Sequence, residues 1–204
     1  MINSKEKILS TAIALFAEKG YSGLTMRQLA AALDMSVAGI YHYFPDKNAL
    51  YLASTRFAFA SKELIFSQVW KSDCTPAIKL KKFVLALITV MSQDRDFCRL
   101  MQREIMEANP DRMRFLAEGV FKDQFALLLQ LATQLAPDRD AFLVATSIIG
   151  LVKIYVDHQP LNKHFPGWQR EYEQPERIAA HITDLLLKGL NQPPESFNFN
   201  QSEF

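Results

Sequence analysis

The chain of 204 residues has few of the features that mark secreted, membrane-spanning or metal-binding proteins. Its two cysteines, Cys74 and Cys98, have no second cysteine or histidine nearby at metal-ligand spacing. This usage is typical of a reducing compartment and predicts neither a disulfide framework nor a metal site. No apolar run approaches the roughly 20 residues that span a bilayer, and residues 1–9 lack the apolar segment of a signal peptide. We therefore expect a cytoplasmic protein with no membrane partner.

The signatures of catalysis are absent as well. The four histidines (His42, His158, His164 and His181) fall in separate predicted elements. Neither a Ser/His/Asp order nor a glycine-rich phosphate loop occurs. From these residues we expect no catalytic site, no cofactor and no enzyme activity.

The charge of the chain is almost balanced, with a formal net value of +1. This argues against a protein that coats nucleic acid without selectivity. Residues 1–60 carry six Lys or Arg against four Asp or Glu. So small an excess fits a groove-reading module with few phosphate contacts, which needs two subunits for useful affinity.

Strand patterns and early prolines are also missing. No proline precedes Pro45, and most of the eight that follow it fall between helical runs. No stretch shows convincing strand alternation, so we expect an all-α fold of about nine helices. The expected helices cover residues 4–19, 26–33, 37–44, 47–70, 77–91, 94–108, 113–135, 138–158 and 175–190, with an irregular loop at 161–174.

Two short helices joined by a tight turn are predicted within residues 24–47. Thr25 is a good N-cap and Gln28 follows three residues later, which is the pattern of a capping box. The first helix has one apolar face, made of Met26, Leu29, Ala30 and Leu33. Ser36 caps the second helix, whose apolar side holds Val37, Ile40 and Phe44. This is the pattern of a helix-turn-helix, in which the second helix can enter a DNA major groove.

The outer face of the second helix is small, polar and aromatic rather than charged. Ala38 and Gly39 permit the close approach of another backbone. Tyr41 and Tyr43 offer hydroxyl groups to phosphate oxygens, and Lys47 adds a cation at the start of the next helix. From spacing alone, a helical hairpin with scattered surface tyrosines explains the pattern as well as DNA binding does.

This part of the chain resembles the N-terminal domain of tetracycline-repressor-type (TetR) regulators. The matching residues are Ile8-Leu9, Ala12, Leu15-Phe16, Gly20-Tyr21, Leu24-Thr25, Arg27, Leu29-Ala30, Leu33, Ser36, Gly39, Ile40-Tyr41, Tyr43-Phe44, Lys47 and Leu50. The match is dense and almost without gaps, and it covers about the first quarter of the chain. The resemblance implies a dimeric transcription regulator whose larger C-terminal part binds a small ligand.

The resemblance divides the chain into a DNA-binding domain at 1–47, a ligand-binding and dimerisation domain at 48–192, and a polar tail at 193–204 without a clear structural signal. The residues expected at the DNA interface are Thr25, Arg27, Ser36, Val37, Ala38, Gly39, Tyr41, His42, Tyr43 and Lys47. Of these, Thr25, Tyr41, Tyr43 and Lys47 are expected on phosphates. Arg27, Val37, Ala38, Gly39 and His42 are expected at or near base edges.

The last two long helices are candidates for a homodimer interface. Small residues on 138–158 permit close approach, and apolar residues on 175–190 add contact area. The interface residues proposed from the sequence are Ala141, Ala145, Gly150, Ile182, Leu185 and Leu186. The alternative is that both helices belong to the core of a single subunit.

The middle of the chain is rich in large, flexible apolar side chains, with fifteen Phe and seven Met overall. These favour a pocket for an apolar or aromatic ligand, although a Phe-rich core explains them too. The predicted ligand residues are Phe59, Phe83, Leu87, Phe97, Met101, Arg103, Phe121, Gln124, Phe125 and Lys153. Lys153 and Asp157 are four residues apart on a helix, which also fits a surface ion pair, and Arg103 with Glu107 invites the same interpretation.

Together these observations predict a ligand-responsive transcriptional regulator that binds a double-stranded, partly palindromic DNA operator as a homodimer. The preferred form is a repressor released by a small apolar or aromatic effector. The alternative is an effector-independent, DNA-organising protein of the same fold.

Overall fold

The computed structural model describes residues 4–190, which form eleven α-helices, one 3-10 helix and no strand. The prediction of an all-α fold is therefore confirmed for the described residues. The elements are α1 (Ser4–Gly23), α2 (Met26–Leu33), α3 (Val37–Tyr43), α4 (Lys47–Lys71), α5 (Pro76–Gln93), α6 (Arg95–Glu107), α7 (Pro110–Gly119), α8 (Lys122–Leu135), α9 (Ala141–Asp157), α10 (Gln159–Asn162), η1 (Arg170–Glu173) and α11 (Pro175–Leu190). None of these helices is both long and apolar enough to cross a bilayer.

The described chain divides into two compact units. The first comprises residues 4–72 and 86–126, and the second comprises residues 73–85 and 127–190. Helices α5 and α8 therefore contribute residues to both units. The boundary that the sequence suggests after residue 47 lies inside the first unit, at the N-terminus of α4.

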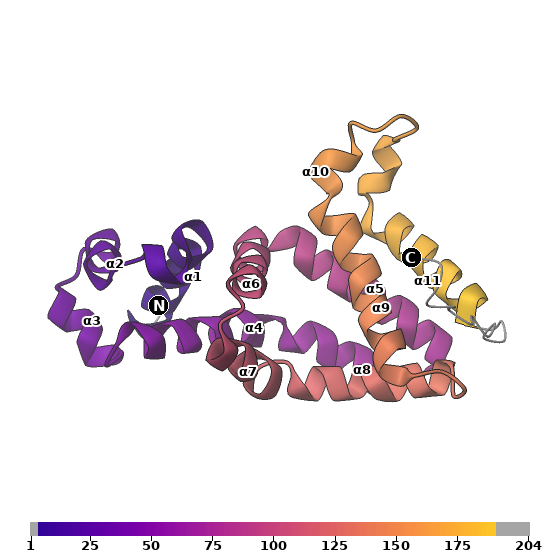
Figure 1. The fold of residues 1–204 in the computed structure, drawn as a ribbon, viewed down its shortest axis with the longest axis horizontal. Coiled ribbons are helices and arrows are strands. Elements are labelled where there is room, and N and C mark those ends of the chain that lie inside the picture. The colour runs from indigo at the N-terminus through magenta and orange to yellow at the C-terminus, as the bar shows by residue number, and fades with distance from the viewer. Residues whose placement is uncertain (1–3, 191–204) are drawn as a thin grey trace, which may run out of the picture. The chain divides into compact units, whose positions relative to one another are not determined.

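The first unit is built around α1, which packs against α2, α4 and α6 (Figure 1). Its buried stripe recurs at helical spacing, and Ile8, Ala12 and Phe16 are completely buried, as the sequence predicts. Leu100 of α6 joins the same core, so α6 is anchored directly to the N-terminal helices. Burial of one such large apolar side chain stabilises the fold by about 1.5–3 kcal/mol.

Gly20 ends the first regular run of α1, with φ 74° and ψ 171°. This conformation is open almost only to glycine. A Cβ atom at residue 20 would also lie 3.2 Å from Glu107 Oε1 and 3.4 Å from an Arg103 guanidinium nitrogen. At the predicted stop of this helix, side chains from the C-terminal half of α6 therefore lie against α1.

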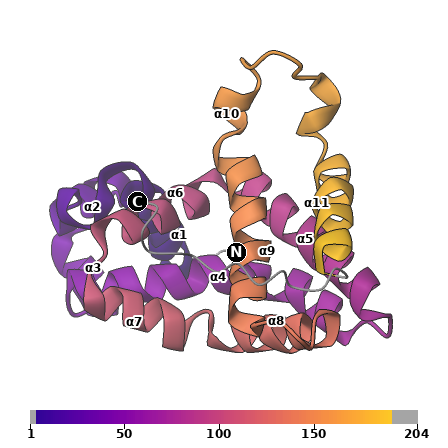
Figure 2. The same ribbon diagram turned by 45° about the vertical axis from the view of Figure 1, so that its right-hand side comes forward.

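In the second unit, α9 and α11 pack against each other, and α10 with the following loop and η1 joins them (Figure 2). Val144, Ile148 and Val152 follow one another at four-residue spacing on the buried side of α9. Ala179 and Ile182 of α11 are buried as well. The apolar periodicity of the two helices therefore fixes which of their faces form the core of this unit.

Several predicted helix boundaries are wrong. The single helix expected at 113–135 is two helices, because α7 ends at Gly119 and both Val120 and Phe121 donate their backbone N–H to the Leu116 carbonyl. The helix expected from residue 138 begins at 141, where Asp140 caps it. The loop expected at 161–174 is partly helical, since it contains the end of α10 and η1. The tail at 193–204 lies outside the described residues.

Candidate nucleic-acid interface

The turn between α2 and α3 is fixed by one left-handed residue and by two hydrogen bonds. Asp34 adopts a left-handed conformation with φ 54°, and the Met35 N–H donates to the Ala30 carbonyl at 2.9 Å. The Ser36 hydroxyl oxygen then accepts a hydrogen bond from the Gly39 N–H at 3.0 Å. The predicted break at residues 34–35 and the predicted cap at residue 36 are both confirmed.

The start of α2 carries the predicted capping box. The Gln28 N–H donates to Thr25 Oγ1 at 3.2 Å, and the Thr25 N–H donates to Gln28 Oε1 at 2.9 Å. Such reciprocal bonds satisfy two amide groups that the first turn of a helix leaves free. Thr25 and the neighbouring Arg27 are both exposed, so their side chains are accessible at this end of α2.

Helix α3 has one side in the core and the other in solvent. Ile40 is completely buried and Phe44 is 3% exposed, whereas Tyr41 is 46% and Tyr43 37% exposed. The remaining predicted interface residues of α3 follow the same division, with Ala38 and His42 exposed and Val37 and Gly39 half-buried. A short helix held by its buried side and both of its ends can present the other side as a rigid surface.

Gly39 also has a structural reason to be a glycine. A Cβ atom at this position would lie 3.2 Å from Ser36 Oγ, which already accepts the capping hydrogen bond. The sequence interpretation that Gly39 permits close approach therefore applies first to the cap of α3 itself.

Lys47 lies at the first position of α4, where the Asp46 side chain caps the helix by accepting from the Ala49 N–H at 2.7 Å. Its ammonium nitrogen is 4.6 Å from the centre of the Tyr21 ring, within the range of a cation–π contact. Burial lowers the pKa of Lys47, the charge of Arg112 lowers it further, and Glu107 opposes both effects.

A buried charged cluster lies behind Lys47. Arg112 of α7 donates from Nε to Glu104 Oε2 at 2.8 Å and from a terminal nitrogen to Glu107 Oε2 at 2.5 Å. Its guanidinium carbon is also 4.5 Å from the centre of the Tyr21 ring and 5.6 Å from that of Tyr51. Glu104 is 1% exposed, and burial together with this carboxylate raises the pKa of the Tyr51 phenol.

The sequence pattern does not predict this cluster. It favours a pair between Glu107 and Arg103, but Arg103 instead donates to the backbone carbonyls of Ala17 and Glu18 at 2.9 and 2.7 Å. The prediction of an ion pair between Arg103 and Glu107 is therefore wrong, because each of the two side chains bonds to another group. The sequence carries one signal of the cluster: Glu104 is a charged residue within the apolar positions of α6.

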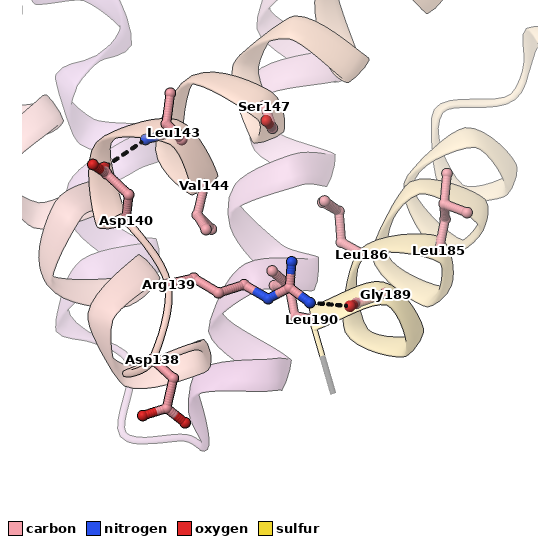
Figure 3. A pocket seen from close by; sticks show the side chains of 10 residues that line it. All are labelled: Asp138, Arg139, Asp140, Leu143, Val144, Ser147, Leu185, Leu186, Gly189 and Leu190. Carbon is pink, nitrogen blue, oxygen red and sulfur yellow. Dashed lines mark hydrogen bonds between the residues drawn. The ribbon is translucent and has the colours of Figure 1, made fainter. Parts of the chain in front are cut away.

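Two pockets lie in the second unit. The first is lined by the beginning of α9 and the end of α11, including Leu143, Val144, Leu185 and Leu186, and Arg139 closes one side by donating to the Gly189 carbonyl (Figure 3). The second is lined by residues of α9, α10, η1, α11 and the loop after α10, which include the aromatic side chains of Phe165, Trp168 and Tyr172. None of the predicted effector residues lines either of these two pockets.

Several of the predicted effector residues meet instead along α4 in the first unit. The Phe59 and Phe121 rings pack edge to face with their centres 4.9 Å apart. Gln124 Oε1 accepts a hydrogen bond from Trp70 Nε1 at 2.7 Å. Aromatic surface and one oriented amide thus both lie against α4.

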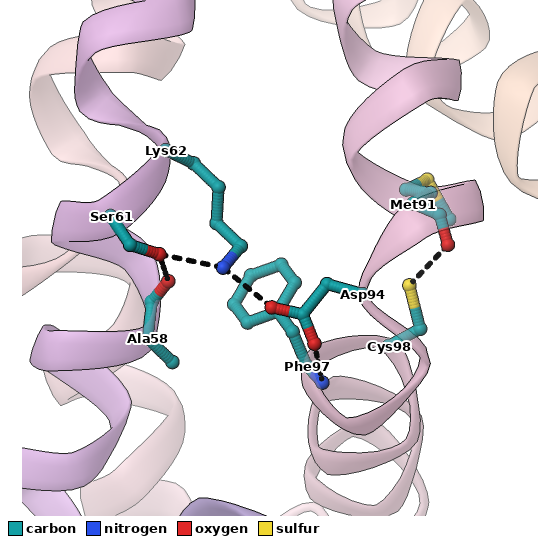
Figure 4. Close-up of polar contacts among 7 residues, drawn as sticks. All are labelled: Ala58, Ser61, Lys62, Met91, Asp94, Phe97 and Cys98. Atoms are coloured by element: carbon teal, nitrogen blue, oxygen red, sulfur yellow. Dashed lines mark hydrogen bonds and ion pairs between the residues drawn. The ribbon is translucent and has the colours of Figure 1, made fainter. Parts of the chain in front are cut away.

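Phe97 also lies against α4, beside a second charged contact (Figure 4). The Lys62 ammonium is 5.2 Å from the Phe97 ring centre and 2.6 Å from Asp94 Oδ2, and the Phe97 N–H donates to Asp94 Oδ1 at 2.9 Å. Burial by itself would raise the pKa of the Asp94 carboxyl, but the hydrogen bonds from Lys62 and the Phe97 amide lower it below its ordinary value.

The other predicted effector residues are placed apart from this group. Met101 packs against the core of the N-terminal helices, and Arg103 is bonded to the end of α1. Lys153 forms the predicted surface pair with Asp157, at 2.9 Å. Phe83 is buried in the second unit, whereas Leu87 and Phe125 are half-buried in the first.

The predicted interface residues of α9 and α11 differ in accessibility. Ala145 and Ile182 are completely buried within the chain itself, and Leu186 is 9% exposed. Gly150 and Leu185 are exposed, while Ala141 is half-buried. Within residues 4–190, no group of three or more His, Cys, Asp or Glu side chains is arranged to hold a metal ion.

Sequence comparison identifies the N-terminal region. The domain model of bacterial regulatory proteins of the tetR family matches residues 8–54, which include the whole of α2 and α3. YttP of Bacillus subtilis, a probable HTH-type transcriptional regulator, is 30% identical over 106 residues, or 51% of this chain and 51% of YttP. The match therefore spans about half the length of this relative.

Structural comparison extends the likeness to nearly the whole chain. FadR of Bacillus subtilis, in complex with stearoyl-CoA, aligns with a TM-score of 0.74 and 17% identity over 90% of this chain and 97% of FadR. AibR, in complex with isovaleryl coenzyme A and operator DNA, aligns with a TM-score of 0.68 and 24% identity over 91% of this chain and 98% of AibR. At these identities the likeness shows a shared fold. The region from α1 to the first turns of α4 thus matches the N-terminal domain of bacterial regulatory proteins of the tetR family, and the described chain as a whole shares the fold of these two solved regulators.

Proposed function

We propose that the chain is a transcriptional repressor that binds a partly palindromic operator as a homodimer and is released by a small apolar effector. One observation carries the DNA-binding part of this proposal. Helix α3 has a neutral, exposed side, its opposite side is anchored in the core by the buried Ile40 and Phe44, and the Ser36 cap fixes its first turn. Such a helix can enter a major groove without rearranging the rest of its domain.

The contacts to DNA would divide by chemistry. Tyr41, Tyr43 and Thr25 offer exposed hydroxyl groups and Lys47 an ammonium group, and all four can contact phosphate oxygens. Arg27, Val37, Ala38, Gly39 and His42 would lie at or near base edges. Arg27 can bind a guanine edge through two hydrogen bonds, and the small side chains leave room for thymine methyl groups.

Two copies of α3 would be needed, because one short helix reads only half of a site. In such dimers the half-sites lie about 34–36 Å apart along the DNA. The exposed apolar side chains of the second unit support an interface on α9 and α11. Phe142, Leu143 and Ile154 of α9 are 56%, 62% and 48% exposed, and Leu185 of α11 is 50% exposed.

For the effector we propose an apolar acyl or aromatic compound held near Phe59, Phe121 and Gln124. These residues combine aromatic surface with a single oriented amide, the combination typical of small-molecule sites. FadR and AibR, which share the fold, were solved in complex with stearoyl-CoA and isovaleryl coenzyme A. Acyl-CoA compounds of different chain length are therefore the first effectors to test.

The experiment that tests DNA reading is a pull-down of sheared genomic DNA from the source organism, followed by sequencing of the retained fragments. Enrichment of one or a few palindromic sites supports the proposal, whereas many dispersed sites support the DNA-organising alternative. The Tyr41→Ala variant should lose the enrichment and remain a dimer. Tyr172→Ala is the matched control, because Tyr172 is exposed to a similar extent, 41% against 46%, and lies on η1. Retained enrichment in Tyr41→Ala would refute the assignment of α3.

The enriched fragment then tests the effector. Because the two sites are linked, an effector that lowers the affinity for DNA by some factor must have its own affinity lowered by DNA by the same factor. Titrating acyl-CoA compounds against the fragment, and the fragment against the bound acyl-CoA, measures both factors. If no acyl-CoA compound changes the affinity for the fragment, the proposed effector class is refuted, while the DNA-binding proposal stands on the enrichment itself.

A further inference from the structure

Two cations from distant parts of the sequence share one aromatic ring. The Lys47 ammonium lies 4.6 Å and the Arg112 guanidinium 4.5 Å from the centre of the Tyr21 ring. The two charges can therefore be no further apart than the sum of these distances. Two like charges repel each other at such a separation, so their arrangement must be stabilised by other groups.

The stabilising groups belong to α6. Glu104 and Glu107 each accept a hydrogen bond from the Arg112 guanidinium, at 2.8 and 2.5 Å, and Arg112 itself is only 9% exposed. A guanidinium bound by two carboxylates has its plane fixed, unlike the rotating ammonium of a lysine. The Tyr21 ring therefore packs against a cation whose position is set by α6 and α7.

The Tyr21 ring is held by two further aromatic contacts. It meets the Tyr51 ring edge to face with the ring centres 5.2 Å apart, and it stacks on Phe16 at 6.3 Å. Phe16 and Tyr51 are almost completely buried. The ring is thus a fixed surface that contacts both the buried cluster and Lys47.

We propose that Arg112 is a positioning residue for DNA binding: through the shared Tyr21 ring it sets the place of the Lys47 ammonium beside α3, and so determines whether Lys47 reaches a phosphate. This inference rests on the proposed function, because it assumes that Lys47 contacts DNA. It adds that a residue of α7, far from α3 in the sequence, governs that contact. Displacement of α7 relative to α1 would release the ring and with it the cation.

The test is a double-mutant cycle on DNA affinity, with the fragment enriched by the wild-type protein as the probe. Removing Arg112 alone would leave a buried Glu104 carboxylate without a partner and could unfold the chain. The variant is therefore Arg112→Gln combined with Glu104→Gln, and Arg112→Lys is made as a second, charge-conserving variant. Arg114→Gln is the matched control, because Arg114 is an exposed cation on the same helix. The DNA affinity of the wild type and of each of these variants is measured with and without the additional substitution Lys47→Gln.

We expect Lys47→Gln to lower the slope of log affinity against log salt by about 0.9 for each phosphate that the protein no longer neutralises. The Arg112/Glu104 variant and Arg112→Lys should lower the slope similarly, and adding Lys47→Gln to either should change it little further. In the Arg114→Gln background, Lys47→Gln should retain its full effect. Equal effects of Lys47→Gln in all backgrounds would overturn the proposal.

A second measurement does not need DNA. NMR titration of Lys47 should give a higher ammonium pKa in the Arg112/Glu104 variant than in the wild type, because the neighbouring guanidinium charge is gone and the ammonium is free to enter water. An unchanged Lys47 titration would show that the two residues are not coupled and would overturn the proposal. Failure of the wild type to bind any fragment would refute the proposed function instead, with the Lys47 titration still reporting on the coupling.

Discussion

The contact between Lys62 and Asp94 allows a quantitative prediction, because one carboxylate serves two roles that different substitutions separate. Asp94 Oδ2 accepts from the Lys62 ammonium at 2.6 Å, and Oδ1 caps α6 by accepting from the Phe97 N–H at 2.9 Å (Figure 4). Asp94→Ala removes both roles. Asp94→Asn keeps the cap, since asparagine is an equally good N-cap, and removes only the charge.

The expected magnitudes follow from burial. Loss of a helix N-cap costs about 1 kcal/mol. Removing one partner of a fully buried ion pair costs about 3–5 kcal/mol, and an exposed pair contributes about 0–1 kcal/mol. The Lys62 side chain is 10% exposed and that of Asp94 36%, so solvent screens the pair in part. We expect a loss of about 1–2 kcal/mol in the free energy of unfolding for Asp94→Asn and about 2–3 kcal/mol for Asp94→Ala.

Lys62→Met removes the other partner of the ion pair and should cost less than either substitution of Asp94. The methionine keeps the apolar contact with Phe97, leaves the Asp94 cap in place and removes a nearly buried charge, so its cost should be below about 1 kcal/mol. The assay is urea unfolding at one fixed protein concentration, since the stability of a dimer depends on concentration. If Asp94→Asn and Asp94→Ala lose the same amount, the cap contributes nothing. If Lys62→Met loses more than Asp94→Ala, the magnitude expected for the pair is wrong.

The same pair predicts a dependence on pH. The folded-state pKa of Asp94 is below its ordinary value, so its stabilisation is complete above the ordinary carboxyl pKa and is lost as the pH falls through the lowered one. The difference in stability between the wild type and Asp94→Asn should therefore be largest near neutral pH and shrink in acid. A difference that grows on acidification would contradict the sign of this shift.

Three further predictions concern the two helix ends and the dimer. Thr25→Ala removes the capping box of α2 and should lower the free energy of unfolding by about 1 kcal/mol and also weaken DNA binding, with the exposed Ser22→Ala as the control. Gly20→Ala introduces a side chain at φ 74°, and urea unfolding should show a loss of about 1–3 kcal/mol, whereas no loss would mean that the backbone relaxes there. If the proposed homodimer forms through α9 and α11, Leu185→Asp should convert it to monomers in light-scattering measurements, while Leu64→Asp, at 68% exposure on α4, should leave it intact.

The helix-turn-helix can be predicted from sequence because each of its determinants is local. The cap at Thr25 and its partner Gln28 are three residues apart, as are Ser36 and Gly39. The apolar periodicity of α1–α3 agrees with these caps, and every predicted core position of α2 is buried. When caps, turns and periodicity agree within about 25 residues, the local structure is strongly specified.

The division of residues 113–135 into α7 and α8 cannot be predicted in the same way. Apolar residues continue across the break, and no proline marks it. The only local signal is Gly119, which ends α7 but is tolerated inside many helices. What ends the helix is the Leu116 carbonyl, which accepts from both the Val120 and Phe121 amides. Such a shared acceptor depends on how the neighbouring elements pack.

The effector region and the dimer interface are only partly accessible to sequence reasoning, because apolar residues serve a core, a pocket and an interface equally well. Ala145 and Leu185 illustrate this: residue type assigns both to the interface, yet one is completely buried in the chain and the other is half exposed. Burial is a property of the folded chain, and a periodic pattern shows which face is apolar without showing what covers it.

The charged cluster around Arg112 is even harder to predict from the sequence than the dimer interface. One residue of the cluster nevertheless gives a signal in the sequence. Arg112 is separated from Tyr21 by some ninety positions and from Lys47 by more than sixty, so no window of sequence contains the contact. Yet burying a guanidinium is costly unless carboxylates and hydrogen bonds compensate for its lost hydration, and Glu104 lies where the periodicity of α6 calls for an apolar residue. A carboxylate in an apolar stripe therefore implies a buried cation from another element. Because the cation found here contacts the same ring as a predicted DNA-binding lysine, the exception to the hydrophobic pattern of α6 leads directly to the contact that we propose to position Lys47.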